Sequence, residues 1–156
     1  MKQTPEYDRI QEQMKPGVIA LDGFLGDDKR KLIDIIASDN TKVHKLNRTH
    51  VDIASRMEHF KELGLPGLGE FITLDDHFEV KVDSVRGILP SPFGGKGMYG
   101  KVNTTVINKK LDRQIVYTDL HVHFVADHAF YEGKGSPFRL EPVDLIEILE
   151  VPEAEE

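Results

Sequence analysis

The sequence predicts an α+β domain in which helices come first and a mostly antiparallel sheet follows. Two observations carry this prediction. Apolar residues recur at helical spacing up to about residue 64, whereas beyond Gly69 they alternate every second residue, which is the period of a strand. Consecutive strands joined by short turns pair antiparallel, and helices that precede a run of strands indicate the α+β class.

The length of 156 residues suits one domain, and a chain of this size buries enough surface to hold a core without disulfides. We expect a polar lead-in over residues 1–16, a single folded domain over residues 17–151, and an acidic tail over residues 152–156. The chain has no cysteine, which excludes disulfides, thiolate metal sites and a cysteine nucleophile.

Two helices are predicted in the first half of the chain. One runs over residues 27–38, because its first residue is a favourable N-cap and its apolar residues share one face. The other runs over residues 49–64, where Thr49 and Asp52 have the capping-box spacing. Gly64 stands where a C-cap glycine belongs, which predicts that this helix ends there.

Three strands are predicted in the second half, over residues 78–82, 102–108 and 115–126. Residues 138–151 form either one or two further strands or a terminal helix, since their apolar residues fit both periods. A sheet that curls around the second helix, in a hot-dog-like or barrel-like manner, is one layout that fits these elements. This is an analogy at the level of the fold.

The net charge of −7 belongs to the end of the chain. The last sixteen residues hold seven acidic side chains and no basic one, so the first 140 residues hold 20 of each sign. Neither a signal peptide nor an apolar run of about 18 residues is present, so we expect a cytoplasmic protein without membrane association.

The segment from Asp119 to Glu132 is the main candidate for chemistry. On a strand over residues 115–126, the alternate side chains of Tyr117, Asp119, His121 and His123 would point away from the core. Two histidines at i and i+2 can converge on a divalent transition metal such as zinc, iron or nickel. The predicted metal site comprises Asp119, His121, His123, His128 and Glu132. The alternative is a solvated or oligomer-forming face of the sheet.

Two glycine-lysine loops form a second candidate site. Lys96 and Lys134 each lie between glycines and could swing onto a small anionic ligand, with backbone N–H groups assisting. The candidate ligand-binding residues are Gly95, Lys96, Gly97, Lys134 and Tyr117. The alternative is a pair of mobile surface loops. Residues 95–100 also match G-x-G-x-x-G, but a strand follows them where a dinucleotide-binding fold needs a helix.

Basic side chains exceed acidic ones in the helical part. Between Lys29 and Lys61 there are eight basic residues against four acids. This excess allows contact with nucleic acid, although it is modest for DNA binding and a solvated helix face explains it more simply. The basic residues are Lys29, Arg30, Lys31, Lys42, Lys45, Arg48, Arg56 and Lys61.

No complete catalytic motif is present, so whether the chain is an enzyme stays open. The leading hypothesis is a small cytoplasmic domain that binds a ligand or self-associates as a homo-oligomer. The first alternative is a metal-dependent enzyme or metal-binding protein that uses the His-x-His strand. The second alternative is nucleic-acid contact through the basic helices.

Overall fold

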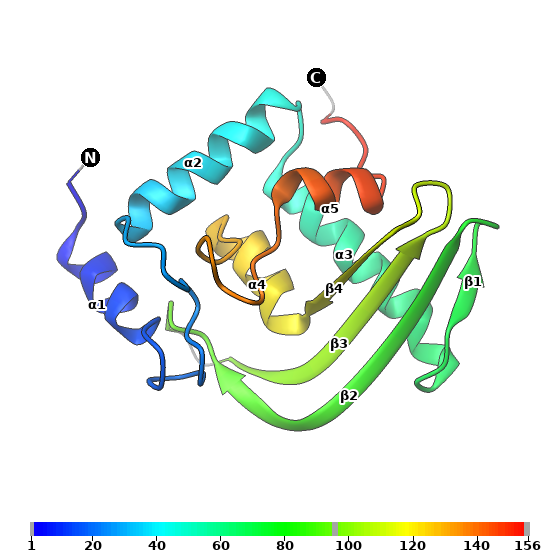
Figure 1. The fold of residues 1–156 in the computed structure, drawn as a ribbon, viewed down its shortest axis with the longest axis horizontal. Helices are drawn as coiled ribbons and strands as arrows, with labels where there is room; N and C mark the ends of the chain where they lie inside the picture. The colour runs from blue at the N-terminus through cyan, green and yellow to red at the C-terminus, as the bar shows by residue number, and fades with distance from the viewer. Residues whose placement is uncertain (1, 95–96, 155–156) are drawn as a thin grey trace.

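A curved antiparallel sheet wraps around three helices in the computed structural model, which describes residues 2–94 and 97–154 (Figure 1). Its strands, in the order β1-β2-β3-β4, are Ile72–Leu74, Phe78–Pro90, Met98–Asn108 and Arg113–Thr118. The helices are α1 (Pro5–Gln13), α2 (Leu32–Lys45), α3 (His50–Gly64), α4 (Asp119–His128) and α5 (Pro142–Ile148), with a 3₁₀ turn over Leu65–Gly67. The α+β prediction is confirmed, and the sheet stays open over the described residues, without closing into a barrel.

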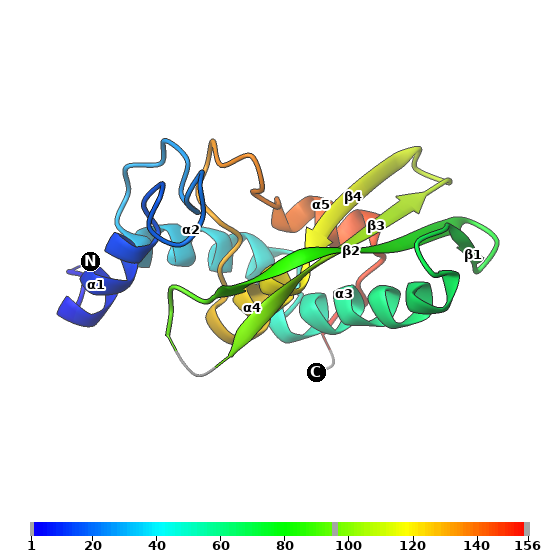
Figure 2. The same ribbon diagram turned by 90° about the horizontal axis from the view of Figure 1, so that it is seen from below.

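Helix α3 lies along one face of the sheet (Figure 2). Its start is as predicted, because the Thr49 hydroxyl accepts a hydrogen bond from the Asp52 N–H at 3.0 Å. Gly64 is the last residue of α3, and a Cβ there would lie 2.7 Å from Val80 and 2.8 Å from Val82. The absence of a side chain at Gly64 therefore allows the close approach of the helix to β2.

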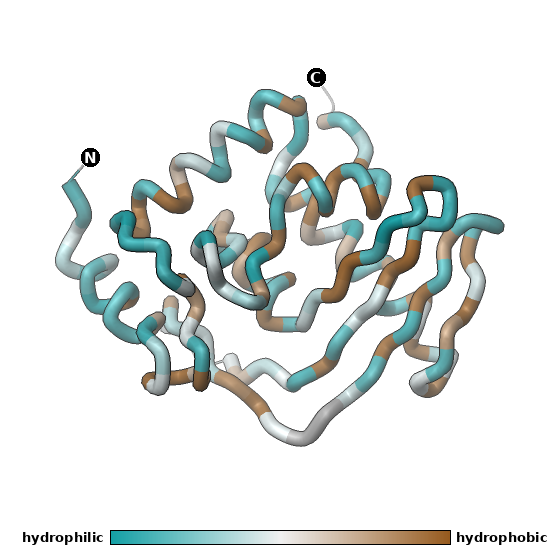
Figure 3. Tube along the Cα trace, in the orientation of Figure 1, coloured by the Kyte–Doolittle hydropathy of each residue, from teal (hydrophilic) through white to brown (hydrophobic). Residues whose placement is uncertain are grey.

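Within the polar lead-in expected over residues 1–16, helix α1 packs against the rest of the fold. Helix α1 buries Ile10, and Met14 behind it is fully buried. Although α1 is mostly hydrophilic (Figure 3), two of the polar side chains in this segment have structural partners. The side-chain oxygens of Gln3 and Gln11 accept hydrogen bonds from the N–H groups of Ile33 and Leu32, at the start of α2.

Helix α2 begins at Leu32 and runs to Lys45, so the prediction of residues 27–38 places both ends too early. Asp27, the N-cap expected from the sequence, lies before the observed N-cap, Lys31, whose side chain makes no capping hydrogen bond. Helix N-termini leave N–H groups without partners inside the helix, and here residues distant in the sequence supply the acceptors.

Hydrophobic and hydrophilic residues alternate along parts of the strands, as the colours in Figure 3 show. Phe78, Val80 and Val82 are buried under the helices, which confirms the prediction for residues 78–82. Strands β3 and β4 contribute Val106 and Ile115 to the same core. Helices α3, α4 and α5 cover this inner face (Figure 1).

The predicted third strand is wrong beyond Thr118, where β4 ends and α4 begins. The Thr118 hydroxyl accepts a hydrogen bond from the His121 N–H at 3.2 Å, and the Thr118 N–H donates to His121 Nδ1 at 3.0 Å. This reciprocal arrangement is a capping box in which a histidine replaces the usual Glu or Gln. Of the two alternatives for residues 138–151, strands or a terminal helix, the structure has the helix, α5.

Two partly buried histidines link the stability of this fold to pH. His50 lies between Asn40 and Tyr131, with 2.8 Å from Nε2 to the Asn40 amide oxygen and 2.8 Å from Nδ1 to the Tyr131 hydroxyl. Burial lowers the pKa of His50 below its ordinary value of 6.5. Burial, and then the nearby His123, lowers the pKa of His128 in the same direction.

We therefore predict that the free energy of unfolding falls as the pH drops below about 6.5. The unfolded chain binds more protons there, so the stabilisation is complete above 6.5 and is lost as the pH falls through the lowered pKa values. Each histidine contributes a slope of at most ~1.4 kcal/mol per pH unit. Urea unfolding between about pH 7.5 and 5 measures the slope. His50→Gln should flatten it, and the exposed control His59→Gln should not. A slope unchanged in His50→Gln would contradict the assignment.

Candidate functional site

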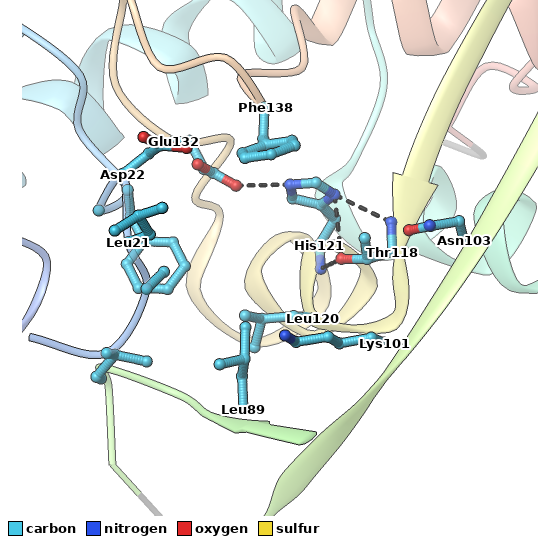
Figure 4. Close-up of a pocket in the computed structure, with 14 residues that line it drawn as sticks. Leu21, Asp22, Leu89, Lys101, Asn103, Thr118, Leu120, His121, Glu132 and Phe138 are labelled. Atoms are coloured by element: carbon cyan, nitrogen blue, oxygen red, sulfur yellow. Dashed lines mark hydrogen bonds and ion pairs between the residues drawn. The ribbon is translucent and has the colours of Figure 1, made fainter. Parts of the chain in front are cut away.

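A pocket of about 400 Å³ lies between the segment 19–24, strands β2 and β3, the start of α4, and the segment 132–138 (Figure 4). Most of its lining is apolar, and Leu21 and Phe138 on its rim are exposed. The lining residues whose side chains carry a polar group are Asp22, Lys101, Asn103, Thr118, His121 and Glu132.

Histidine 121 and Glu132 form a buried pair in the pocket wall, with 2.6 Å between Nε2 and the carboxylate. The other carboxylate oxygen of Glu132 accepts a hydrogen bond from the Ser136 hydroxyl at 2.9 Å. Because Nδ1 of His121 accepts from the Thr118 N–H, the ring proton lies on Nε2, where it is donated to Glu132. Figure 4 shows the ring between Thr118 and Glu132, beside Phe138.

This pair holds two parts of the chain together. It joins the start of α4 to the segment after α4, where Glu132 adopts a left-handed backbone conformation with φ of 70°. Both ring nitrogens of His121 already have partners, so the ring has no free lone pair to accept a proton or bind a metal ion. His121 and Glu132 are therefore best explained as a structural link that shapes the pocket.

Lys101 and Asn103 bring polar groups to the pocket from β3. Lys101 is exposed, and none of the ion pairs found among residues 2–94 and 97–154 involves it. Its methylene stem lies beside Gly87, where an added Cβ would be 3.2 Å from Cε. Gly87 has a φ of 120°, within the irregular pairing of β2 between Val85 and Ile88. This bulge therefore leaves room for the lysine next to the pocket.

Histidine 123 belongs to a second polar group. Its Nε2 lies 3.1 Å from the Ser91 hydroxyl, and its Nδ1 lies 2.8 Å from the carboxylate of Asp127, one helical turn further along α4. The Tyr99 hydroxyl is 2.9 Å from the same Nδ1, and the Tyr99 ring stacks on the imidazole. Ser91 is buried and also accepts a hydrogen bond from the Phe93 N–H at 3.2 Å.

The five predicted metal ligands do not gather at one point. His121 meets Glu132, whereas Asp119 pairs with Lys61 at 2.9 Å and His128 stacks on Phe93 at 3.8 Å between ring centroids. Residues at i and i+2 diverge on a helix, so the ring of His123 does not join that of His121. Within the described ranges, no group of three or more His, Asp and Glu side chains is arranged to hold a metal ion.

The predicted ligand-binding residues are also dispersed. Gly95 and Lys96 lie outside the described residues, and Gly97 lies against the Tyr99 ring. The Lys134 side chain is exposed, and its N–H donates to the Asp28 carboxylate at 3.0 Å.

Tyr117 does not point away from the core, as expected for the polar face of a strand. It is 1% exposed, and its hydroxyl donates to the Met57 carbonyl at 2.7 Å. The reason is that Ile115 and Tyr117 form the inner face of β4, whereas Val116, on the opposite face, is 46% exposed.

Several of the basic side chains in the helical part are bound within the chain. Arg30 pairs with Asp28, Lys61 with Asp119, and Lys42 with Asp39. Arg56 donates to the Leu149 carbonyl and lies over the Phe60 ring. Contact with nucleic acid stays a prediction, and these pairs reduce the charge available for it.

Sequence reasoning missed Lys101 and Asn103 in the pocket, and Ser91, Tyr99 and Asp127 around His123. Ser91 and Tyr99 lie 32 and 24 residues from His123, so no local motif joins them. The spacing of His123 and Asp127 is a signal only on a helix, and a strand was expected there. The i, i+4 relation between them would have indicated a contact had the helix been predicted.

No protein-family model, curated protein or solved structure matches this chain. No helix in the described part of the chain is long and apolar enough to cross a membrane.

The buried pair leads to a prediction about stability. His121→Ala and Glu132→Ala should each lower the free energy of unfolding by ~3 kcal/mol, because each leaves a buried polar partner unpaired. The double variant should cost less than the sum of the two, since neither member of the His121–Glu132 pair is then left without the other. Denaturant unfolding measures these values. Glu12→Ala, which breaks an exposed ion pair with Lys15, serves as control and should change stability by at most ~0.5 kcal/mol. If the loss of unfolding free energy in the double variant equals the sum of the two single losses, the assigned pairing of His121 with Glu132 is contradicted.

Proposed function

We propose that this chain binds a small organic anion, with an apolar body and one anionic group, in the pocket beside His121. The observation that carries the proposal is a largely apolar cavity of about 400 Å³ with Lys101 and Asn103 in its lining. Small-molecule sites are typically concave, mostly apolar, and furnished with a few polar groups that orient the ligand.

The charges in the pocket favour an anionic group near Lys101. Glu132 is satisfied by His121 and Ser136, so its carboxylate needs no further partner. Asp22 is exposed and lies across the pocket from Lys101 in Figure 4. Lys101 and the Asn103 amide can therefore donate hydrogen bonds to an anion without competition from a neighbouring acid.

The rim of the pocket supports an apolar ligand body. Leu21 is 86% exposed and Phe138 is 54% exposed. Exposed apolar side chains that border a hollow are typical of binding sites, because a ligand removes them from water. Covering them stabilises the complex by about 25 cal/mol for each Å² of apolar area buried.

The fluorescent probe 8-anilinonaphthalene-1-sulfonate has the required chemistry, with aromatic rings and one sulfonate. We predict that it shifts the backbone amide signals of residues 19–24 and 101–103 in the NMR spectrum of the folded chain. Lys101→Gln should weaken its binding by up to ~5-fold, the value of an exposed ion pair. Lys45→Gln, an exposed lysine on α2, serves as the matched control and should leave binding unchanged.

The neutral analogue N-phenyl-1-naphthylamine distinguishes binding of the apolar body from recognition of the anionic group. It should bind the same residues more weakly, and Lys101→Gln should not change its affinity. Equal affinity of both probes would contradict anion recognition. Signal shifts confined to other surfaces would contradict the pocket itself.

A further inference from the structure

The geometry around His123 points to a second site, in which Ser91 is an activated nucleophile for the ester of a short-chain acyl group. None of the three side chains involved, Ser91, His123 and Asp127, lines the pocket beside His121. The inference therefore stands independently of the ligand-binding proposal.

The three side chains form a continuous hydrogen-bonded series. Ser91 Oγ is 3.1 Å from His123 Nε2, and His123 Nδ1 is 2.8 Å from Asp127 Oδ2. A hydroxyl, an imidazole and a carboxylate in this order constitute the nucleophile, base and orienting group of acyl-transfer sites on unrelated folds. Such sites are identified by this geometry and not by the order of the residues in the sequence.

The hydrogen bonds place the proton of His123 on Nδ1. A carboxylate only accepts, so the short contact with Asp127 requires Nδ1–H as its donor, and the Tyr99 hydroxyl 2.9 Å from the same nitrogen is then a second acceptor. Nε2 is then a free acceptor for the Ser91 O–H. The imidazole is thus oriented to remove the serine proton, and stacking of the Tyr99 ring at 4.5 Å supports that orientation.

The hydroxyl and the imidazole of the site are largely shielded from solvent, whereas the carboxylate is exposed. Ser91 is 6% exposed and the His123 side chain is 12% exposed, while Asp127 at the edge is 62% exposed. A bulky acyl chain does not fit beside so shielded a hydroxyl. Phe93, Tyr99 and His128 provide aromatic walls nearby, which suit a flat leaving group.

In the reaction, Ser91 Oγ bonds to the ester carbonyl carbon while its proton passes to His123 Nε2. The bond between that carbon and the leaving oxygen then breaks, and the leaving alcohol takes the proton from Nε2. Water attacks the acyl-serine and gives a proton to Nε2, which returns it to Oγ as the carbon–Oγ bond breaks. The products are a carboxylic acid and an alcohol. Asp127 does not touch the substrate and acts as a positioning residue.

Mass spectrometry of the wild-type chain tests the nucleophile directly. After treatment with a fluorophosphonate, Oγ bonds to phosphorus, fluoride leaves, and the proton passes to His123. Trypsin releases residues 87–96 as one peptide, in which Ser91 is the only serine. An adduct on this peptide is the expected result. No adduct, or one confined to other serines, would overturn the proposal without relying on a variant that must fold.

Rates of labelling against probe concentration test the assigned roles. His123→Gln should lower the maximal labelling rate by ~100-fold or more. Asp127→Asn should lower the maximal labelling rate by about 10-fold or more with little change in the half-saturating concentration, and Asp127→Glu should restore part of that rate.

Ser55→Ala and His59→Gln, exposed on α3, are the matched controls and should label as the wild type does. Circular dichroism confirms that each variant is folded. An unchanged labelling rate in His123→Gln would contradict activation of Ser91 by His123. An unchanged labelling rate in Asp127→Asn would contradict the positioning role of Asp127.

The acyl class is tested with p-nitrophenyl acetate and p-nitrophenyl octanoate. Hydrolysis of the acetate ester should depend on Ser91 and exceed hydrolysis of the octanoate ester by at least ~10-fold, since the shielded Ser91 hydroxyl favours a short acyl chain. Equal rates, or hydrolysis that persists in Ser91→Ala, would overturn the assignment of a short-chain ester.

Discussion

The change from strand to helix at Thr118 is the constraint on which the rest of this structure depends. Thr118 makes the last pairing of β4 with β3, opposite Asn103, and it is also the N-cap of α4. Its hydroxyl and N–H both bond to His121, so the chain leaves the sheet at a fixed angle. Helix α4 is thereby directed into the concavity of the sheet (Figure 1), where Phe124 and Val125 are fully buried.

The same turn separates two histidines that are two residues apart. His121, in the first turn of α4, is directed toward Glu132 in the segment that follows the helix, and the pair forms one wall of the pocket. His123 is directed toward Ser91, which follows directly after β2. On a strand both rings would lie on one face. On this helix one ring supports the fold and the other meets a hydroxyl and a carboxylate.

Several elements follow from local sequence signals. The capping pattern at Thr49 predicts the start of α3, and the alternation over residues 78–82 predicts the inner face of β2. Both signals lie within a few residues, so they need no knowledge of distant contacts. The start of α2 could not be found in this way, because Gln3 and Gln11 supply its capping acceptors from far along the chain.

The candidate sites were less accessible to sequence reasoning than the fold. Residues 119–126 alternate in hydropathy as a strand does, and the only local sign of a helix is a capping box completed by histidine. That error placed His121 and His123 together and hid the relation between His123 and Asp127. The pocket depends on Lys101 and Glu132, whose positions are set by a bulge in β2 and by the course of the chain after α4.

Long-range ¹H–¹⁵N NMR correlation of the imidazole nitrogens tests this account most directly, because it reports which nitrogen carries the proton. The two rings should show opposite tautomers in one spectrum. His121 should carry its proton on Nε2, which bonds to Glu132, and His123 should carry its proton on Nδ1, which bonds to Asp127. The same tautomer in both rings, or a ring protonated on both nitrogens at neutral pH, would contradict it.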